Sequence, residues 1–217
     1  MILVPVKNLS GAKQRLAALF DQPTRTELAQ AMLFDVLETL GTWTDRPEVS
    51  IVTSDPFALQ LAKHFCFSVI PDNANRSQTD AIEMATRLCE AQGIDSTLVI
   101  PGDIPLIQSW ELEKILQSAP AQGSVLVRAA DGRGTNAIWR CPARLFPARF
   151  GNDSFEPHYA AARATGKSCV VLSLPGIALD IDTAADLRAL VATAGETRAQ
   201  RLVRQWRIDD LPVAANE

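Results

Sequence analysis

The chain has 217 residues, of which 47% are apolar and 21% charged, and its 21 basic and 25 acidic side chains give a net charge of −4. These values predict one folded domain and argue against a disordered chain or a large basic surface for nucleic acid. We expect a cytoplasmic protein without membrane contact, because no apolar run approaches the roughly 20 residues that span a bilayer and the apolar start lacks a basic leader.

Short apolar runs alternate along the chain with longer amphipathic segments, which is the pattern of an α/β sheet flanked by helices. The apolar runs predict seven strands, over Ile2–Val6, Val49–Thr53, Phe67–Ile70, Thr97–Ile100, Ser124–Ala129, Asn136–Arg140 and Cys169–Leu174. The amphipathic segments predict helices over Thr24–Leu40, Phe57–His64, Thr79–Gln92, Ser109–Gln117, Phe155–Thr165 and Thr183–Thr193. In the first helix, apolar residues at every fourth position should form the buried stripe: Leu28, Met32, Val36 and Leu40.

The last part of the chain predicts a further helix. We expect a single domain over residues 1–217, with a core in residues 1–194 and a C-terminal helix and tail in residues 195–217. Arginines recur here at helical spacing until Pro212 ends the pattern, at positions Arg198, Arg201, Arg204 and Arg207. A solvated helix face explains them better than a functional basic patch.

The four cysteines are widely scattered, without a C-x-x-C pair that would indicate a zinc or redox site. We therefore expect small buried hydrophobic side chains at Cys66, Cys89, Cys141 and Cys169.

A loop with three cations follows the first strand. Small residues and the cations lie in the stretch Lys7-Asn-Leu-Ser-Gly-Ala-Lys13-Gln-Arg15-Leu. Ligands of open α/β sheets bind at the carboxyl ends of the strands, so this loop is well placed to neutralise a triphosphate. It matches neither a P-loop nor a dinucleotide-binding glycine turn, which disfavours an ordinary P-loop NTPase or a nicotinamide dehydrogenase. On spacing alone, three surface cations explain the loop nearly as well.

Two acidic motifs come later in the chain. Pro101-Gly-Asp103-Ile-Pro places a carboxylate at the end of an apolar run, and Asp180-Ile-Asp182 directs two carboxylates to one side of an extended chain. Such oxygen ligands hold Mg²⁺, although a turn or a helix cap would explain either motif alone. With the cationic loop, they are the minimum equipment for nucleotidyl transfer.

Two glycine-containing segments offer donors for an anion. Gly134-Thr135 precedes a strand, and Gly151-Asn-Asp-Ser154 precedes a helix. The backbone N–H of Gly151 and the hydroxyls of Thr135 and Ser154 could cradle a phosphate or carboxylate. A glycine turn followed by an N-cap serine is the simpler alternative. His158 lies one helical turn after Ser154 and could face the same ligand, but a lone, partly buried histidine is the better explanation.

Taken in order, these motifs resemble the guanylyltransferases of coenzyme F420 biosynthesis, known as 2-phospho-L-lactate guanylyltransferase and, in many bacteria, as phosphoenolpyruvate guanylyltransferase. The resemblance runs from the first strand to about Leu190 and rests on Val4-Pro-Val-Lys7, Ala12-Lys13-Gln-Arg15-Leu, Pro101-Gly-Asp103-Ile-Pro, Gly134-Thr135-Asn136-Ala, Phe150-Gly151-Asn-Asp-Ser154 and Asp180-Ile-Asp182-Thr. It implies a single-domain, Rossmann-like fold of the nucleotide-diphospho-sugar-transferase type, with a mixed sheet flanked by helices.

The resemblance also implies roles for particular residues. Mg²⁺ would be held by Asp103, Asp180 and Asp182, and the phosphorylated acid by Thr135, Gly151 and Ser154. The nucleotide-phosphate loop would comprise Lys7, Lys13 and Arg15, and the residues expected to act in catalysis are Lys13, Arg15 and Asp103. A homodimer would be unsurprising for the family.

The expected reaction joins GMP from GTP to a small phosphorylated acid and releases pyrophosphate. The acid would be phosphoenolpyruvate, 3-phospho-D-glycerate or 2-phospho-L-lactate. The chain departs from the family at Arg76-Ser77-Gln78-Thr79-Asp80, where a Gly-Leu-Asn-like segment is typical. Because this region helps to enclose the nucleotide, the resemblance supports the preference for guanine less strongly than it supports the metal site. The alternatives are another nucleotidyltransferase of this fold, using CTP or a sugar phosphate, and a non-catalytic nucleotide-binding domain.

Overall fold

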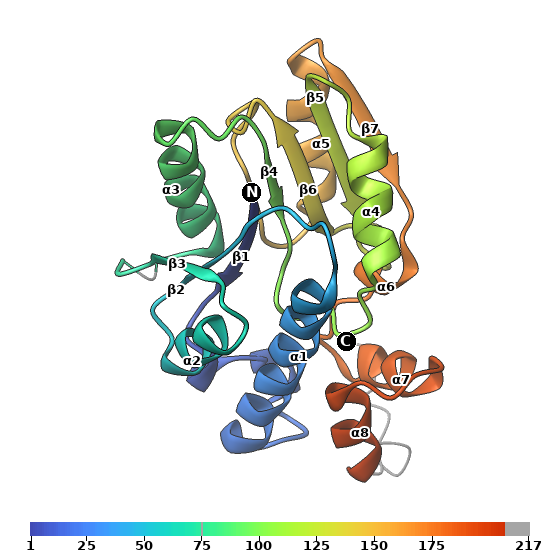
Figure 1. The fold of residues 1–217 in the computed structure, drawn as a ribbon. Helices are drawn as coiled ribbons and strands as arrows, with labels where there is room; N and C mark the ends of the chain where they lie inside the picture. The colour runs from blue at the N-terminus through green and yellow to red at the C-terminus, as the bar shows by residue number, and fades with distance from the viewer. Residues whose placement is uncertain (75, 207–217) are drawn as a thin grey trace.

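The computed structural model describes residues 1–74 and 76–206, in which seven strands form one mixed sheet (Figure 1). The order across the sheet is β3-β2-β1-β4-β6-β5-β7. The strands are β1 (Ile2–Val6), β2 (Val49–Thr53), β3 (Ser68–Pro71), β4 (Thr97–Val99), β5 (Gly123–Arg128), β6 (Thr135–Cys141) and β7 (Ser168–Leu172). All seven predicted strands are confirmed to within two residues at either end.

The six helices predicted with bounds are likewise confirmed to within two residues, and the helix expected within residues 195–217 is present. They are α1 (Gln22–Thr42), α2 (Pro56–His64), α3 (Gln78–Ala91), α4 (Ser109–Ser118), α5 (Phe155–Ala164), α7 (Ala184–Ala192) and the C-terminal α8 (Arg198–Gln205). Helix α6 (Pro175–Ala178) and two 3₁₀ turns, Leu9–Gly11 and Gln14–Leu16, were not predicted, because three or four residues are too few for a periodic pattern.

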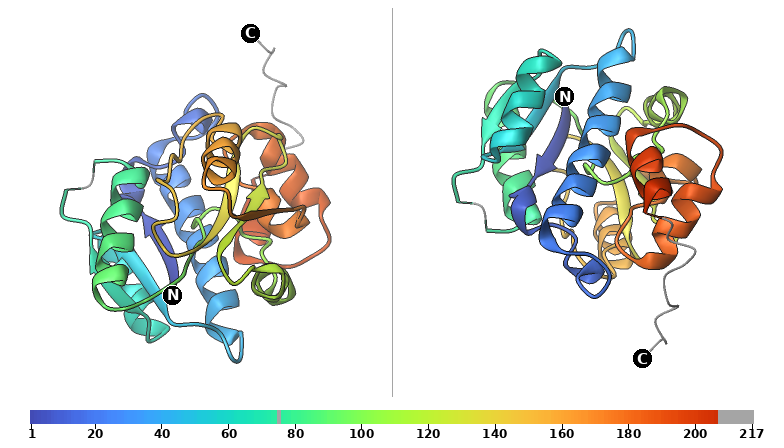
Figure 2. Two further views of the ribbon diagram at one scale, coloured as in Figure 1. Left: turned by 90° about the horizontal axis from the view of Figure 1, so that it is seen from above. Right: turned by 90° about the horizontal axis from the view of Figure 1, so that it is seen from below.

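Helices cover both faces of the sheet, which explains why the strands are apolar on successive residues. On β1, Ile2 and Val4 pack in the cluster that joins α1, α2 and α4, whereas Leu3 packs with α3 on the other face. Helix α5 covers this second face over β5 and β6 (Figures 1 and 2). The predicted stripe of α1 is buried throughout, at Leu28, Met32, Val36 and Leu40.

The direction of β6 determines what lies at the edge of the sheet where ligands bind. β6 runs antiparallel to both of its neighbours, β4 and β5, whereas β1 is parallel to β2 and to β4. The beginning of β6 therefore lies at the same edge as the carboxyl ends of β1 and β4. This reversal brings Thr135 and Asn136 to the edge that carries the loops after Val6 and Val99.

The C-terminal arginines lie on an exposed helix face, as predicted, at Arg198, Arg201 and Arg204. Arg207 and Pro212 lie outside the described residues. Within the described residues, no helix is both long enough and apolar enough to cross a membrane.

The prediction for the cysteines is correct only in part. Cys89 is buried in the cluster under α3, and Cys141 and Cys169 are partly buried. Cys66 is exposed, because it lies in the turn between α2 and β3 with a left-handed backbone (φ 56°).

A buried carboxylate ties the C-terminal helix to the core. Asp35 of α1 is only 5% exposed and accepts hydrogen bonds from the backbone N–H groups of Arg198 and Ala199, both at 2.8 Å. Burial raises the pKa of Asp35, although both hydrogen bonds oppose that shift. The start of α8 is thus fixed against α1, where Ala199 and Val203 pack with Met32.

We predict that Asp35→Ala lowers the free energy of unfolding by about 1–3 kcal/mol, because two helix N–H groups lose their buried acceptor. Urea denaturation measures this change. Glu38→Ala on the same helix is the control, since Glu38 is exposed and should change stability little. Equal effects of the two substitutions would contradict the anchoring role of Asp35.

Candidate active site

Two adjoining pockets lie at the edge where β1 and β4 end and β6 begins. The first, of about 450 Å³, is bounded by the loop after β1, by α1 and by the loop after β4. The second, of about 470 Å³, is bounded by the segments 131–136, 150–154 and 180–183. Their shared wall consists of Arg15, Gln78, Pro101, Asp103 and Asp182.

Every predicted site residue lines at least one pocket. Lys7 and Lys13 line the first pocket only. The second pocket alone contains Thr135, Gly151, Ser154 and Asp180. The remaining three predicted residues, Arg15, Asp103 and Asp182, belong to both.

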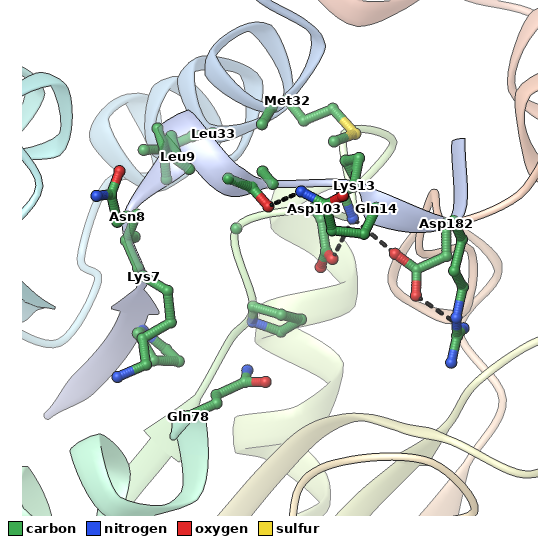
Figure 3. Close-up of a pocket in the computed structure, with 18 residues that line it drawn as sticks. Lys7, Asn8, Leu9, Lys13, Gln14, Met32, Leu33, Gln78, Asp103 and Asp182 are labelled. Carbon is green, nitrogen blue, oxygen red and sulfur yellow. Dashed lines mark hydrogen bonds and ion pairs between the residues drawn. The ribbon is translucent and has the colours of Figure 1, made fainter. Parts of the chain in front are cut away.

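The ammonium group of Lys13 is the centre of the site. Its Nζ donates to Asp103 Oδ2 at 2.7 Å and to Asp182 Oδ1 at 2.9 Å (Figure 3). The Lys13 side chain is only 8% exposed. Burial disfavours the charged form, but the two carboxylates outweigh burial and raise the pKa of Lys13. Lys13 is therefore charged at neutral pH and joins two segments 79 residues apart.

The backbone around Lys13 explains how its side chain reaches the carboxylates. Lys13 has a left-handed conformation (φ 55°) between the two 3₁₀ turns. Arg25 of α1 is buried, and its guanidinium donates to the Lys13 carbonyl at 3.4 Å and to Gln14 Oε1 at 3.0 Å. Arg25 was not among the site residues predicted from the sequence. Its position one turn before Leu28, on the otherwise apolar stripe of α1, was the available signal.

The other two cations of the loop do not both join this cluster. Arg15 Nη1 donates to Asp182 Oδ2 at 3.1 Å, and Arg15 Nη2 donates to Asn152. Lys7 lies apart, at another side of the first pocket (Figure 3), and forms an ion pair of 2.8 Å with Asp72. The structure thus brings two of the three predicted cations together and leaves Lys7 at a separate point of the same pocket.

The acidic segment 180–182 has the alternation that the sequence predicted. Ile181 is fully buried, and its N–H donates to the Asp103 carbonyl at 3.1 Å. Asp180 accepts a hydrogen bond from Asn136 Nδ2 at 3.0 Å. The same amide nitrogen also donates to the carbonyls of Ile177 and Ala178. Asn136 therefore fixes the approach of this segment to β6.

Neither Asp180 nor Asp182 is the N-cap of the helix that follows. Thr183 is the N-cap of α7, in a capping box with Asp186. Burial raises the pKa of Asp180, and the charges of Asp103 and Asp182 raise it further. The three carboxylates therefore act on one another electrostatically, and their repulsion is balanced by Lys13 and Arg15.

The donor set suits a hard divalent cation, because two carboxylates already hold a cation between them and a third lies within electrostatic reach. Across residues 1–74 and 76–206, however, no three acidic, histidine or cysteine side chains are arranged as a metal site. In this structure the ammonium group lies between Asp103 and Asp182, and Asp180 is hydrogen-bonded to Asn136.

The second pocket presents two hydroxyls beside a glycine. The Thr135 N–H donates to Ser154 Oγ at 3.0 Å. Ser154 is the N-cap residue of α5, as the simpler alternative expected, but its side chain makes no capping hydrogen bond. Gly151 has a backbone (φ 140°) that favours glycine, and no atom lies within 4 Å of where its Cβ would be. His158 is fully buried, more than predicted, and contacts Thr135.

Sequence comparison finds a match to the family described as "Guanylyl transferase CofC like" over residues 1–216. Phosphoenolpyruvate guanylyltransferase of Roseiflexus castenholzii is 35% identical over 204 residues, which are 94% of this chain and 93% of that protein. The 2-phospho-L-lactate guanylyltransferase of Methanothermobacter thermautotrophicus is 30% identical, over 97% of this chain and 92% of that protein.

Solved structures share the fold. A protein assigned to the nucleotide-diphospho-sugar transferases, from Desulfovibrio desulfuricans G20, superimposes with a TM-score of 0.75 at 17% identity, over 94% of this chain and 93% of that one. A CMP:2-keto-3-deoxy-manno-octonic acid synthetase gives a TM-score of 0.56 at 16% identity, over 88% of this chain and 96% of that one. The expected fold class is therefore confirmed.

Two substitutions in the acidic segment should have unequal effects on stability. Asp182→Asn should lower the free energy of unfolding by up to about 1 kcal/mol, because Lys13 and Arg15 both lose a partner. Asp180→Asn should be neutral or stabilising, because it removes a half-buried charge that the other two carboxylates repel, while the amide oxygen can still accept from Asn136.

Urea denaturation at neutral pH in the presence of a chelator compares the two variants with the wild type. Equal losses of stability would contradict the conclusion that Lys13 and Arg15 balance the repulsion among the three carboxylates.

Proposed function

Because the chain belongs to the CofC-like guanylyl transferases, we propose that it transfers GMP from GTP to a small phosphorylated carboxylic acid and releases pyrophosphate. The acid is phosphoenolpyruvate, 2-phospho-L-lactate or 3-phospho-D-glycerate, as the resemblance to the guanylyltransferases of coenzyme F420 biosynthesis implies. We assign GTP to the first pocket and the acid to the second.

One observation carries this assignment: the two pockets meet at a wall with carboxylates and a cation. Arg15, Asp103 and Asp182 face both pockets, so the α-phosphate of a nucleotide in the first would lie beside a phosphate in the second. The second pocket is the more polar in its side chains, with the hydroxyls of Thr135 and Ser154, and thus suits a small anion. The first has apolar walls at Met32 and Leu33, which suit a base and ribose.

In the proposed reaction, a phosphate oxygen of the acid attacks the α-phosphorus of GTP, and the bond to the pyrophosphate oxygen breaks. A phosphate monoester has a second pKa of about 6, so the attacking oxygen is ionised at neutral pH and needs no general base. The protein has to position the two substrates and neutralise their charge. Lys13 and Arg15 are assigned to the phosphates of the nucleotide.

Mg²⁺ would be held by Asp103, Asp180 and Asp182. When bound, the ion would offset negative charge on the phosphates in the transition state. The side chains of this chain must rearrange to receive it, because Lys13 lies between two of the three carboxylates. We infer that Lys13 exchanges these carboxylates for phosphate oxygens of the nucleotide, which keeps its buried ammonium group paired in both states.

Lys13→Met should therefore bind Mg²⁺ more tightly than the wild type when nucleotide is absent, because the competing ammonium group is gone. It should also lose turnover, since the nucleotide phosphates lose a cation. Calorimetric titration with MgCl₂ measures the first effect and a pyrophosphate assay the second. Lys114→Met, at an exposed position of α4, is the matched control and should change neither. Weaker Mg²⁺ binding by Lys13→Met would contradict this exchange.

We propose that the segment that departs from the family, residues 76–80, contributes to the choice of the nucleotide base. Gln78 begins α3 and lines both pockets, and Thr79 Oγ1 donates to the Phe150 carbonyl at 3.2 Å. This contact links α3 to the loop of the second pocket. The region where the sequence departs thus borders both proposed substrates, and GTP has to be compared directly with other nucleotides.

Pyrophosphate release tests the proposed function. The protein is assayed with Mg²⁺ and GTP, separately with phosphoenolpyruvate, 2-phospho-L-lactate and 3-phospho-D-glycerate, and ATP and CTP replace GTP as controls. We expect release with GTP and at least one acid. Release with CTP alone, or with no combination, would overturn the proposal.

Asp103→Asn serves as the site control in this assay. It should remain folded but lose about 100-fold or more in turnover, or about 2.7 kcal/mol of transition-state stabilisation. Asp95→Asn, at an exposed position before β4, should match the wild type. Near-normal turnover by Asp103→Asn would contradict the role of this carboxylate.

A further inference from the structure

A buried histidine lies directly behind the second pocket. His158 of α5 is 0% exposed, and its ring makes two hydrogen bonds at opposite nitrogens. The backbone N–H of Arg149 donates to Nε2 at 2.7 Å, and Nδ1 lies 3.0 Å from Thr135 Oγ1. The ring of Phe150 packs edge-on against the imidazole ring, with the two ring centroids 5.0 Å apart. The orientation of the ring is thus fixed by contacts on three sides.

These contacts determine which nitrogen carries the proton. Nε2 accepts a hydrogen bond from an N–H group, so it must present a lone pair. Burial, with the nearby charges of Arg140 and Arg149, lowers the pKa of His158 to about 4, and the ring is neutral at physiological pH. A neutral imidazole carries one proton, which must therefore be on Nδ1. His158 consequently donates to the Thr135 hydroxyl oxygen.

The direction of that bond determines what Thr135 can offer a ligand. Because its oxygen accepts from His158, the hydroxyl proton is left to point elsewhere. Ser154 is in the same condition, since its oxygen accepts from the Thr135 N–H at 3.0 Å. Within residues 1–74 and 76–206, neither hydroxyl donates to another protein group, and both residues line the second pocket. The pocket therefore presents two oriented O–H donors, which suit the oxygen of an anion.

We propose that His158 is a positioning residue that holds the Thr135 hydroxyl as a hydrogen-bond donor to an anionic oxygen of the phosphorylated acid. This inference rests on the proposed function, which assigns the acid to the second pocket. His158 does not touch the substrate and acts only through Thr135. It thereby makes the pocket selective for groups that accept hydrogen bonds.

Two substitutions separate this role from a purely structural one. His158→Gln places an amide oxygen where Nε2 can still accept from Arg149, but it loses the donor to Thr135. His158→Asn places an amide nitrogen near the position of Nδ1, where it can still donate to Thr135, but it loses the acceptor for Arg149. A structural role depends on both hydrogen bonds, whereas the positioning role depends on the bond to Thr135.

We expect His158→Gln to raise the KM for the acid about 10-fold, with the KM for GTP unchanged, and His158→Asn to recover most of this loss. In a Thr135→Val background, His158→Gln should change the KM for the acid less than twofold, because the hydroxyl that it positions is absent. Multiplying effects in the double variant, or equal losses in the Gln and Asn variants, would overturn the proposal.

Nitrogen NMR of the wild-type protein tests the tautomer without any turnover. The chain has two histidines, and the His158→Gln spectrum identifies the signals of His158 by their loss. We expect a neutral ring protonated on Nδ1 at pH 7. A ring protonated on Nε2, or on both nitrogens, would overturn the proposal.

Calorimetry measures the affinity of the same variants for phosphoenolpyruvate without any turnover. This measurement tests the role of His158 separately from the proposed reaction. If the wild type releases no pyrophosphate with any acid, the proposed function fails. Weaker binding to His158→Gln than to His158→Asn would still support the positioning role, and equal binding would overturn it.

Discussion

The pairing of one buried ammonium group with two carboxylates organises the whole site. Lys13 comes from the loop after the first strand, Asp103 from the loop after β4 and Asp182 from the segment before α7, and no local interaction would bring these three together. Burial makes the charge of Lys13 costly unless it is paired, so the two carboxylates stabilise the position of its side chain in the fold. Arg25 and Asn136 support the pair from either side, one through the Lys13 backbone and the other through the acidic segment.

The reversed strand β6 gives this site its second half. In a wholly parallel sheet, the start of β6 would lie at the opposite edge, away from the loops after β1 and β4. Because β6 is antiparallel, its first two residues have separate tasks at the same edge: Thr135 faces the second pocket and Asn136 holds the segment that carries Asp180. The position of β6 therefore sets both the proposed acid pocket and the acidic segment.

The strands, the long helices and the identity of the residues around the pockets could be predicted from the sequence, because apolar runs, helical stripes and short motifs are local patterns. Pairings between distant residues could not. The contact of Lys7 with Asp72, 65 residues away, depends on the arrangement of strands, and the reach of Lys13 depends on a left-handed backbone that its sequence does not signal. His158 was expected to be a histidine without a ligand, since its neighbours Arg149 and Thr135 meet it only in the folded chain. Arg25 lies on the apolar stripe of α1, and a charged residue there was a signal that the sequence did contain.

The shared wall of the two pockets has a thermodynamic consequence. Arg15, Asp103 and Asp182 belong to both, so any ligand that draws Arg15 toward one pocket changes the electric field that a ligand meets in the other. Linkage makes such an effect reciprocal: whatever the nucleotide adds to the binding free energy of the acid, the acid adds to that of the nucleotide. A site divided by a charged wall thus couples its two ligands without any change of fold, and the strength of the coupling is set by how far a few side chains move.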